Sequence, residues 1–338
     1  MKGLVIKGSS NAERQYGMKS GDRVAEALQK RGWIIDTVDG GDLRRTLTKL
    51  QSNSPDIAIP IGFGPLSAED GTFWTLAQAV GIPCAGPSPT AGCICTEKSL
   101  FNALVRGLFE SHTNVTTPME IKISAGMTEG DSYEAIKASG LSAPLIVKPV
   151  LGGSSSGLHL ATSIEDAAAS AVARTPVFGS MLVQQMIENA REFTVTTLDE
   201  LSGTRFLPII ELNRQGTSIM GEDEKFGPDA RKRHIVNPKM TSDLKRRLQE
   251  TALRIHNAVG ARGIQRIDVL VSDDNRIFIL EANPVAGLLA ESLAVDAAAA
   301  AGLSFEDLAE RYALTALLPA VNGFKFQSFT NDSYEVLA

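Results

Sequence analysis

Two neighbouring apolar segments of the chain carry polar side chains at alternate positions: Arg266 and Asp268 in the first, Glu281 and Asn283 in the second. Because side chains alternate across a β-strand, each pair is expected on one face of its strand. A polar turn at residues 273–276 separates the segments and predicts a β-hairpin. Such a hairpin would collect carboxylate and amide groups on a single face.

The register of this hairpin decides whether the two acids meet. If residues 273–276 form the turn, Ser272 pairs with Ile277, and Asp268 then faces Glu281. Facing carboxylates repel each other unless a cation lies between them. Their oxygen atoms favour Mg²⁺ or Mn²⁺ over Zn²⁺, so the segment predicts a divalent metal site. The simpler alternative is a solvated edge hairpin with scattered acids.

Length, charge and cysteine content restrict the class of protein. A chain of 338 residues is long for one hydrophobic core, so two or three subdomains with a cleft between them are expected. The net charge of −6 argues against a nucleic-acid partner. No apolar run is long enough for a signal peptide or a membrane span, which favours the cytoplasm.

The chain has three cysteines, Cys84, Cys93 and Cys95, which are too few for a disulfide framework or a zinc site. Buried or inert thiols are therefore expected.

Apolar patterns and turn residues divide the chain into sections of α/β type. The predicted sections are an N-terminal α/β unit at 1–96 with a parallel sheet, a central unit at 97–187, a C-terminal unit at 188–325 and a polar tail at 326–338. Strands are expected at 4–7, 34–38, 56–61, 144–149, 158–160, 193–198 and 205–212, and helices at 22–31, 98–110, 163 onward and 242–259. Residues 213–238 exceed the usual loop length, which predicts a functional or mobile segment.

A glycine- and serine-rich loop, Leu151–Gly157, follows Lys148 and Pro149. Its small side chains would let backbone NH groups approach a phosphate. It lacks the Gly-Lys-Ser/Thr ending of a Walker A loop, and the two flanking strands predict an antiparallel flap; a plain hairpin turn explains the composition equally well. Three lysines, Lys98, Lys148 and Lys225, could neutralise a nucleoside triphosphate, although each by itself also fits a solvated surface charge.

The chain is similar to the ATP-grasp superfamily in the order of five features along the sequence: Lys98, Lys148-Pro149, the loop Gly153–Gly157, Arg266-x-Asp268 and Glu281-x-Asn283. Within it, the chain resembles the D-alanine-D-alanine ligases, with further likeness at 11–14, 69–71 and 191–195. This resemblance implies an α/β (α+β) fold of three subdomains, with ATP held between the central and C-terminal sheets. It also implies a homodimer that acts on small amino acids.

The resemblance assigns roles to individual residues. The implied ATP contacts are Lys98, Lys148, Ser154, Gln184, Gln185, Ile187, Glu192 and Lys225. The implied ligands of two Mg²⁺ ions are Asp268, Glu281 and Asn283. The implied catalytic residues are Glu13, Ser155, Arg266 and Gly287, and the implied substrate contacts are Glu13, Phe226, Ser292 and Leu293.

The implied reaction has two steps. A substrate carboxylate attacks the γ-phosphate of ATP, and an amine then attacks the resulting acyl phosphate, whose oxyanion Arg266 and the Gly287 amide would stabilise. The chain departs from the family pattern where no histidine precedes Glu69, where Phe226 replaces a tyrosine, and at Gln184-Gln185.

The first two departures surround the second substrate. The third lies beside adenine, where backbone contacts to ATP can survive the change, and the phosphate and metal residues are intact. The leading hypothesis is therefore an ATP-dependent dipeptide ligase for small, D-configured amino acids. The alternative is an ATP-grasp ligase that joins D-alanine to a hydroxy acid, or joins other amino acids or amines. A non-catalytic binding protein would be expected to lack Arg266 or a metal ligand, and a nicotinamide dehydrogenase would need a Gly-x-Gly-x-x-Gly that Gly8-Ser9-Ser10 does not supply.

Overall fold

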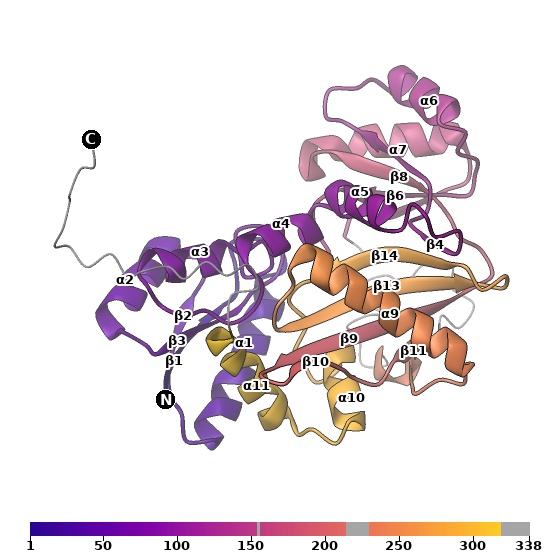
Figure 1. Ribbon diagram of the computed structural model, residues 1–338. Helices are drawn as coiled ribbons and strands as arrows, with labels where there is room; N and C mark the ends of the chain where they lie inside the picture. The colour runs from indigo at the N-terminus through magenta and orange to yellow at the C-terminus, as the bar shows by residue number, and fades with distance from the viewer. Residues whose placement is uncertain (154–155, 214–229, 319–338) are drawn as a thin grey trace, which may run out of the picture.

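The computed structural model describes residues 1–153, 156–213 and 230–318. Three β-sheets with helices packed on them make up the fold (Figure 1). A three-stranded sheet lies in the N-terminal part, a four-stranded sheet comes from the middle of the chain, and a seven-stranded sheet is built mainly from the C-terminal part. The mixed α/β class that the sequence predicts is confirmed.

The N-terminal sheet is parallel, as predicted, with strand order β2-β1-β3. Its strands are β1 (Lys2–Lys7), β2 (Ile34–Asp39) and β3 (Ile57–Ile61), and its helices are α1 (Arg14–Lys30), α2 (Leu43–Asn53), α3 (Thr72–Ala79) and α4 (Pro89–Thr96). Leu4, Val5 and Ile6 are fully buried, because helices and neighbouring segments cover both faces of the sheet.

Helix α1 begins eight residues before the predicted start at residue 22, because Gly17 and Gly21 weaken the helical pattern in its first half. The same glycines allow the helix to lie against the sheet. A Cβ atom at Gly17 would come within 2.9 Å of the Gly8 Cα atom, and one at Gly21 would collide with the side chain of Lys7. Close packing of helix on strand therefore outweighs the low helix propensity of glycine.

The central sheet is antiparallel, with strand order β5-β8-β6-β7. Its strands are β5 (Glu120–Ile123), β6 (Leu145–Pro149), β7 (His159–Ala161) and β8 (Met181–Gln185), and the helices of this part of the chain are α5 (Lys98–Leu108), α6 (Glu129–Ala138) and α7 (Ile164–Phe178). Strands β6 and β7 pair antiparallel on either side of the Gly/Ser loop, which confirms the predicted flap. Ser163 caps α7 by accepting a hydrogen bond from the Asp166 amide at 3.1 Å.

The large sheet has the order β12-β11-β9-β13-β14-β4, and β10 pairs with β9. Its strands are β4 (Val115–Thr116), β9 (Ala190–Glu200), β10 (Gly203–Phe206), β11 (Ile210–Leu212), β12 (His234–Val236), β13 (Ile264–Ser272) and β14 (Ile277–Asn283). Helix α9 (Ser242–Val259) has its predicted bounds and ends at Gly260, which adopts a left-handed conformation. Strand β12 and the short helix η1 (Ala230–Arg233) lie inside the predicted loop 213–238, so a loop over that whole range is wrong.

The last helices, α10 (Leu293–Ala300) and α11 (Phe305–Leu314), followed by the short η2 (Thr315–Leu317), return to the N-terminal part (Figure 1). One hydrophobic cluster contains Val5 and Leu28 together with Ala297, Leu308 and Tyr312. The Tyr312 hydroxyl donates to the carbonyl oxygen of Pro60 at 2.8 Å. This shared core fixes the N-terminal part against the large sheet.

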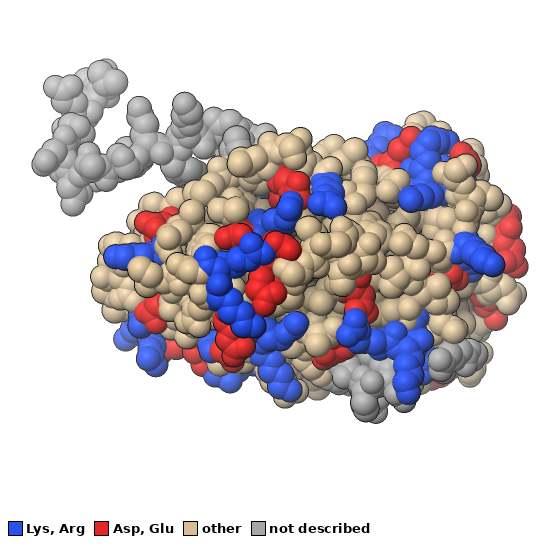
Figure 2. All heavy atoms as spheres, turned by 90° about the horizontal axis from the view of Figure 1, so that it is seen from below, with Lys and Arg blue, Asp and Glu red and all other residues tan. Residues whose placement is uncertain are grey.

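Both signs of charge occur on the surface, and the three thiols differ in burial. Acidic and basic side chains are interspersed over the face drawn in Figure 2. No helix within the described residues has both the length and the apolar character needed to span a bilayer. Cys84 and Cys95 are buried, and burial raises the pKa of the Cys95 thiol to about 12. Cys93 is exposed, so of the two predicted states, buried or inert, burial applies only to Cys84 and Cys95.

Candidate active site

Strands β13 and β14 form the predicted hairpin, and Asp268 lies opposite Glu281 as expected. The turn is one residue longer on the β13 side than predicted: Val271, and not Ser272, pairs with Ile277. An irregularity after Asp268 places Leu280 as an extra residue in β14, which restores the Asp268–Glu281 pairing.

This bulge also decides which way Glu281 points. Ile277 and Ile279 pack into the hydrophobic cluster beneath the sheet, together with Ile267 and Val269. Without the bulge, strict alternation would carry Glu281 onto the same apolar face as these isoleucines. With it, Glu281 turns to the opposite face, where Asp268 lies.

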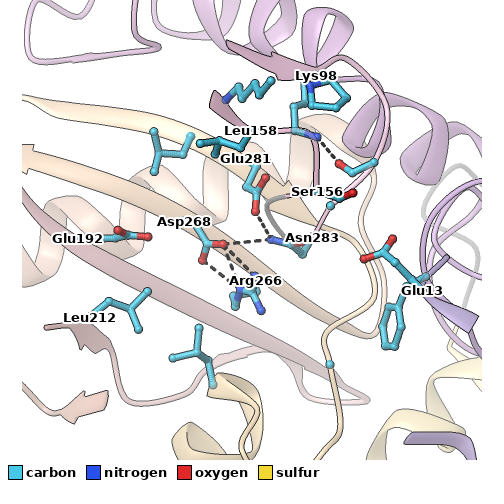
Figure 3. Close-up of a pocket in the computed structure, with 18 of the residues that line it drawn as sticks. Glu13, Lys98, Ser156, Leu158, Glu192, Leu212, Arg266, Asp268, Glu281 and Asn283 are labelled. Carbon is cyan, nitrogen blue, oxygen red and sulfur yellow. Dashed lines mark hydrogen bonds and ion pairs between the residues drawn. The ribbon is translucent and has the colours of Figure 1, made fainter. Parts of the chain in front are cut away.

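Hydrogen bonds join the polar groups of the hairpin into one cluster (Figure 3). Arg266 Nε donates to Asp268 Oδ1 at 3.0 Å, and Arg266 Nη2 donates to Oδ2 at 2.9 Å. Thr194 on β9 donates to Asp268 Oδ1 at 2.7 Å. Burial acts to lower the pKa of Arg266, but the charge and hydrogen bonding of Asp268, together with the charges of Glu281 and Glu69, outweigh it and hold the pKa above its ordinary value. The guanidinium group therefore stays charged within the site.

Asn283 connects the two acids of this cluster. Its Nδ2 atom lies 3.1 Å from Asp268 Oδ2 and 3.4 Å from Glu281 Oε1. Both carboxylates are thus within reach of one small centre, and a turn of the Asn283 amide would present its oxygen there instead. In the described part of the chain, no cluster of three or more His, Cys, Asp or Glu side chains is arranged to hold a metal. Two carboxylates and one amide fit Mg²⁺, which commonly completes its shell with substrate phosphates and water.

The central part of the chain faces this hairpin across a cavity of about 280 Å³. Lys98, at the start of α5, is buried, and its ammonium group donates to the carbonyl oxygen of Gly152 in the Gly/Ser loop. A Cβ atom at Gly153 would lie 3.3 Å from Glu13 Oε1. The loop therefore reaches from the central sheet to the first helix of the chain and closes one side of the cavity.

The end of β8 lines the same cavity, but the side chain of Gln184 is already engaged. Its Nε2 atom donates to Glu120 Oε2 at 2.9 Å, and the Gln185 backbone NH donates to Met119 O at 2.8 Å. Gln185 Oε1 accepts from the Ser142 NH at 3.4 Å. These contacts fix the strip that is predicted to lie beside adenine, whose last residue, Ile187, also lines the cavity.

The opposite end of the cavity is formed by the turn before α10. Ser292 Oγ accepts from the Leu289 NH at 3.0 Å and would lie 3.0 Å from a Cβ atom at Gly287. Arg23 of α1 donates to the carbonyl oxygen of Leu288 and so holds this turn against the N-terminal part. A side chain at position 287 would displace Ser292, which is a physical reason for glycine there.

Every predicted site residue that the structure describes lines this one cavity. These residues are Glu13, Lys98, Lys148, Gln184, Gln185, Ile187, Glu192, Arg266, Asp268, Glu281, Asn283, Gly287, Ser292 and Leu293. Ser154, Ser155, Lys225 and Phe226 lie outside the described residues. Residues that are more than 250 positions apart in the sequence thus meet around a single space.

Comparison with known proteins identifies the family. The profile described as "D-ala D-ala ligase C-terminus" matches residues 115–313. The D-alanine–D-alanine ligase of Desulforudis audaxviator is 32% identical over 307 residues, which cover 90% of this chain and 95% of the relative. That of Gloeobacter violaceus is 32% identical over 315 residues, 92% of this chain and 98% of the relative. The chain belongs to the D-alanine–D-alanine ligase family.

The fold agrees with this assignment. The crystal structure of a Bacillus anthracis D-alanine–D-alanine ligase in complex with ATP superposes with a TM-score of 0.75 at 21% identity, covering 96% of this chain and 100% of that one. As a member of the D-alanine–D-alanine ligase family, the protein is an ATP-dependent ligase that forms carbon–nitrogen bonds. The resemblance drawn from the sequence is confirmed.

The cavity of this D-alanine–D-alanine ligase family member is also lined by residues with no predicted role of their own. Glu69 accepts from the Gly64 NH at 2.6 Å; burial raises the pKa of its carboxyl to about 7, and the nearby Glu13 carboxylate adds to this rise. Its place in the Glu-Asp-Gly segment was the signal that could have identified it. Arg233 and His234 line the cavity too, and they lie in the segment 213–238, for which the sequence predicts a functional or mobile loop.

Proposed function

We propose that this protein joins two small D-amino acids through an acyl phosphate, with ATP and Mg²⁺, and that the first step occurs over the β13–β14 hairpin. The observation that carries this proposal is the cluster in which Asn283 lies between Asp268 and Glu281, with Arg266 beside it. The names of the relatives, which are D-alanine–D-alanine ligases, support D-alanine as a substrate.

In the first step, a carboxylate must approach the γ-phosphate of ATP, although both groups are negative. Lys98 and Lys148 line the cavity on the side of the Gly/Ser loop, where their charges would offset this repulsion. Asp268, Glu281 and Asn283 are the residues that would hold Mg²⁺, which supplies further charge neutralisation at the phosphates. The ends of β8 and β9, with Ile187 and Glu192, would then border the nucleoside.

In the second step, an amine attacks the acyl carbon and negative charge develops on its oxygen. Arg266, kept charged by Asp268, and the backbone NH of Gly287 line the cavity near that place. Preorganised donors of this kind typically lower the barrier by several kcal/mol. Glu13, at the start of α1, would hold the ammonium group of the first amino acid, and Ser292 with the amino end of α10 would hold the carboxylate of the second.

The proposal is tested by incubating the protein with ATP, Mg²⁺ and single or paired amino acids of both configurations, measuring ADP release and identifying the product by mass spectrometry. We expect ADP and dipeptide to form in equal amounts with D-alanine. ADP formation only with L-amino acids, or with no amino acid pair, would overturn the substrate assignment. Omission of Mg²⁺ should abolish turnover, and Mn²⁺ should restore it in part.

The setting and assembly that we propose follow the resemblance: a cytoplasmic homodimer. Measurement of the molar mass in solution by light scattering tests the assembly, since a monomer at micromolar concentration would contradict it.

A further inference from the structure

An acid and a histidine form a buried pair at the end of the cavity that lies away from the hairpin. His234, on β12, directs Nδ1 to Asp296 Oδ2 at 2.7 Å. The two side chains are only 6% and 7% exposed. The Arg231 guanidinium group contacts the same carboxylate from the outside. Arg231 therefore holds the Asp296 carboxylate in place, and this carboxylate fixes the position of the His234 imidazole.

This pair lies next to the proposed subsite for the second amino acid. Asp296 and Ser292 are four residues apart, on the same face of the first turn of α10, and the Asp296 NH donates to the Ser292 carbonyl oxygen at 3.1 Å. His234 pairs across the sheet with Leu212. Both His234 and Leu212 line the cavity, as do Ser292 and Leu293.

The surroundings make the imidazole unusual. Leu212, Leu289 and Leu293 line the cavity here, as do the charged side chains of Arg233 and Glu291. With Nδ1 engaged by Asp296, the second ring nitrogen, Nε2, has no hydrogen-bond partner among the described residues. Because His234 lines the cavity, the small surface that it retains faces the substrate space. A ring nitrogen without a partner in the wall of a cavity favours a ligand that can bond to it and disfavours one that cannot.

We propose that His234 selects the second amino acid: Nε2 exchanges a hydrogen bond with a polar side chain, so an acceptor with a short hydroxyl-bearing side chain is preferred to one of equal size without it. This inference rests on the proposed dipeptide ligation. Asp296 acts as a positioning residue, because it fixes the tautomer and orientation of the ring. Arg231 supports Asp296 from the surface.

The test uses two acceptors of nearly equal shape, D-serine and D-2-aminobutyrate, which differ by a hydroxyl against a methyl group. The full-length protein receives ATP, Mg²⁺, D-alanine and both acceptors at equal concentration, and tandem mass spectrometry measures the D-alanyl dipeptides that end in each acceptor. The product ratio equals the ratio of the two kcat/KM values and does not depend on how much active protein is present. We expect D-serine to be preferred about tenfold.

Two variants locate the preference at the histidine. His234→Leu should bring the product ratio to about one, and His234→Gln, whose amide can still hydrogen-bond, should keep part of it. A wild-type ratio near one would overturn the inference without any variant, as would an unchanged ratio in His234→Leu. If no pair of amino acids yields a dipeptide at all, the proposed function fails; dipeptide formation without discrimination leaves that function intact and refutes only the role of His234.

Discussion

The two ends of the cavity are built in different ways. At the hairpin end, Arg266, Asp268, Glu281 and Asn283 come from one continuous segment of 18 residues, and their hydrogen bonds lie almost entirely within it. At the acceptor end, the wall combines β11, β12 and the turn before α10, whose residues are up to 80 positions apart. The groups proposed for phosphate and metal chemistry are thus set by one local unit, and those proposed for substrate choice are set by tertiary packing. Variants at the first end should chiefly change turnover, and variants at the second should chiefly change selection.

The largest effect is expected from Glu281→Gln at the hairpin end. Gln retains an oxygen that can accept from Asn283 but removes the negative charge proposed to hold Mg²⁺. We expect kcat to fall by about 10³-fold with little change in the free energy of unfolding. Steady-state kinetics and chemical denaturation check this. Asp274→Asn, in the exposed turn of the same hairpin, is the matched control and should leave kcat unchanged.

Arg266→Lys tests whether charge alone is enough at this end. Arg266 binds both oxygens of Asp268, whereas an ammonium group cannot span them in the same geometry. We expect a loss of about 10² in kcat, with a smaller change in the KM for ATP. Arg191 makes an equivalent two-point contact with Glu211 but does not line the cavity, so Arg191→Lys is the control. Equal losses in both variants would mean that the effect is on the sheet and not on the reaction.

This difference between the ends also explains what the sequence could predict. The hairpin, its acids and their pairing follow from alternation and turn residues, which act over a few positions. Its bulge could not be predicted, because the extra residue, Leu280, is apolar like the three residues before it, and only the buried positions of Ile277 and Ile279 show where alternation breaks. The prediction assumed one register for the whole hairpin. Its turn was one residue too short and it omitted the one-residue bulge, and because these two errors cancel, the predicted Asp268–Glu281 pair is correct.

Local sequence patterns do not predict the structure of the acceptor end. Strand β12 has only three residues and owes its place to pairing with β11 and to the contact of His234 with Asp296. Neither interaction leaves a periodic signal near residue 234, so the segment was predicted as loop. In helix α1 the local pattern is misleading for another reason. Gly17 and Gly21 weaken the helical pattern in its first half, yet its close packing requires glycine at both positions.

Gly287→Ala should perturb the acceptor end in preference to the hairpin. The added Cβ atom would lie 3.0 Å from Ser292 Oγ, so the Ser292 side chain must give way by a few tenths of an ångström. We expect kcat/KM for the second amino acid to fall about tenfold, with the KM for ATP nearly unchanged. Gly107→Ala, in helix α5 with nothing within 4 Å of the added atom, is the control and should not alter either constant. A fall that is the same for ATP and for the amino acid would remove the distinction between the two ends.

The smallest effect is expected from Arg231→Met, which removes the outermost member of the Arg231–Asp296–His234 series. The Arg231 side chain is 59% exposed, so solvent screens its attraction to Asp296, and ion pairs of this kind contribute about 0.2–1 kcal/mol. His234 remains bonded to Asp296 in the variant. We therefore expect the KM for the second amino acid to rise by about two- to threefold, with kcat unchanged. Arg246→Met, which breaks exposed pairs with Asp243 and Glu250 on α9, offers a control of equal charge. A loss of turnover in Arg231→Met as large as that in Arg266→Lys would mean that the Arg231–Asp296–His234 series takes part in the chemical step, and this series could no longer be assigned to substrate selection alone.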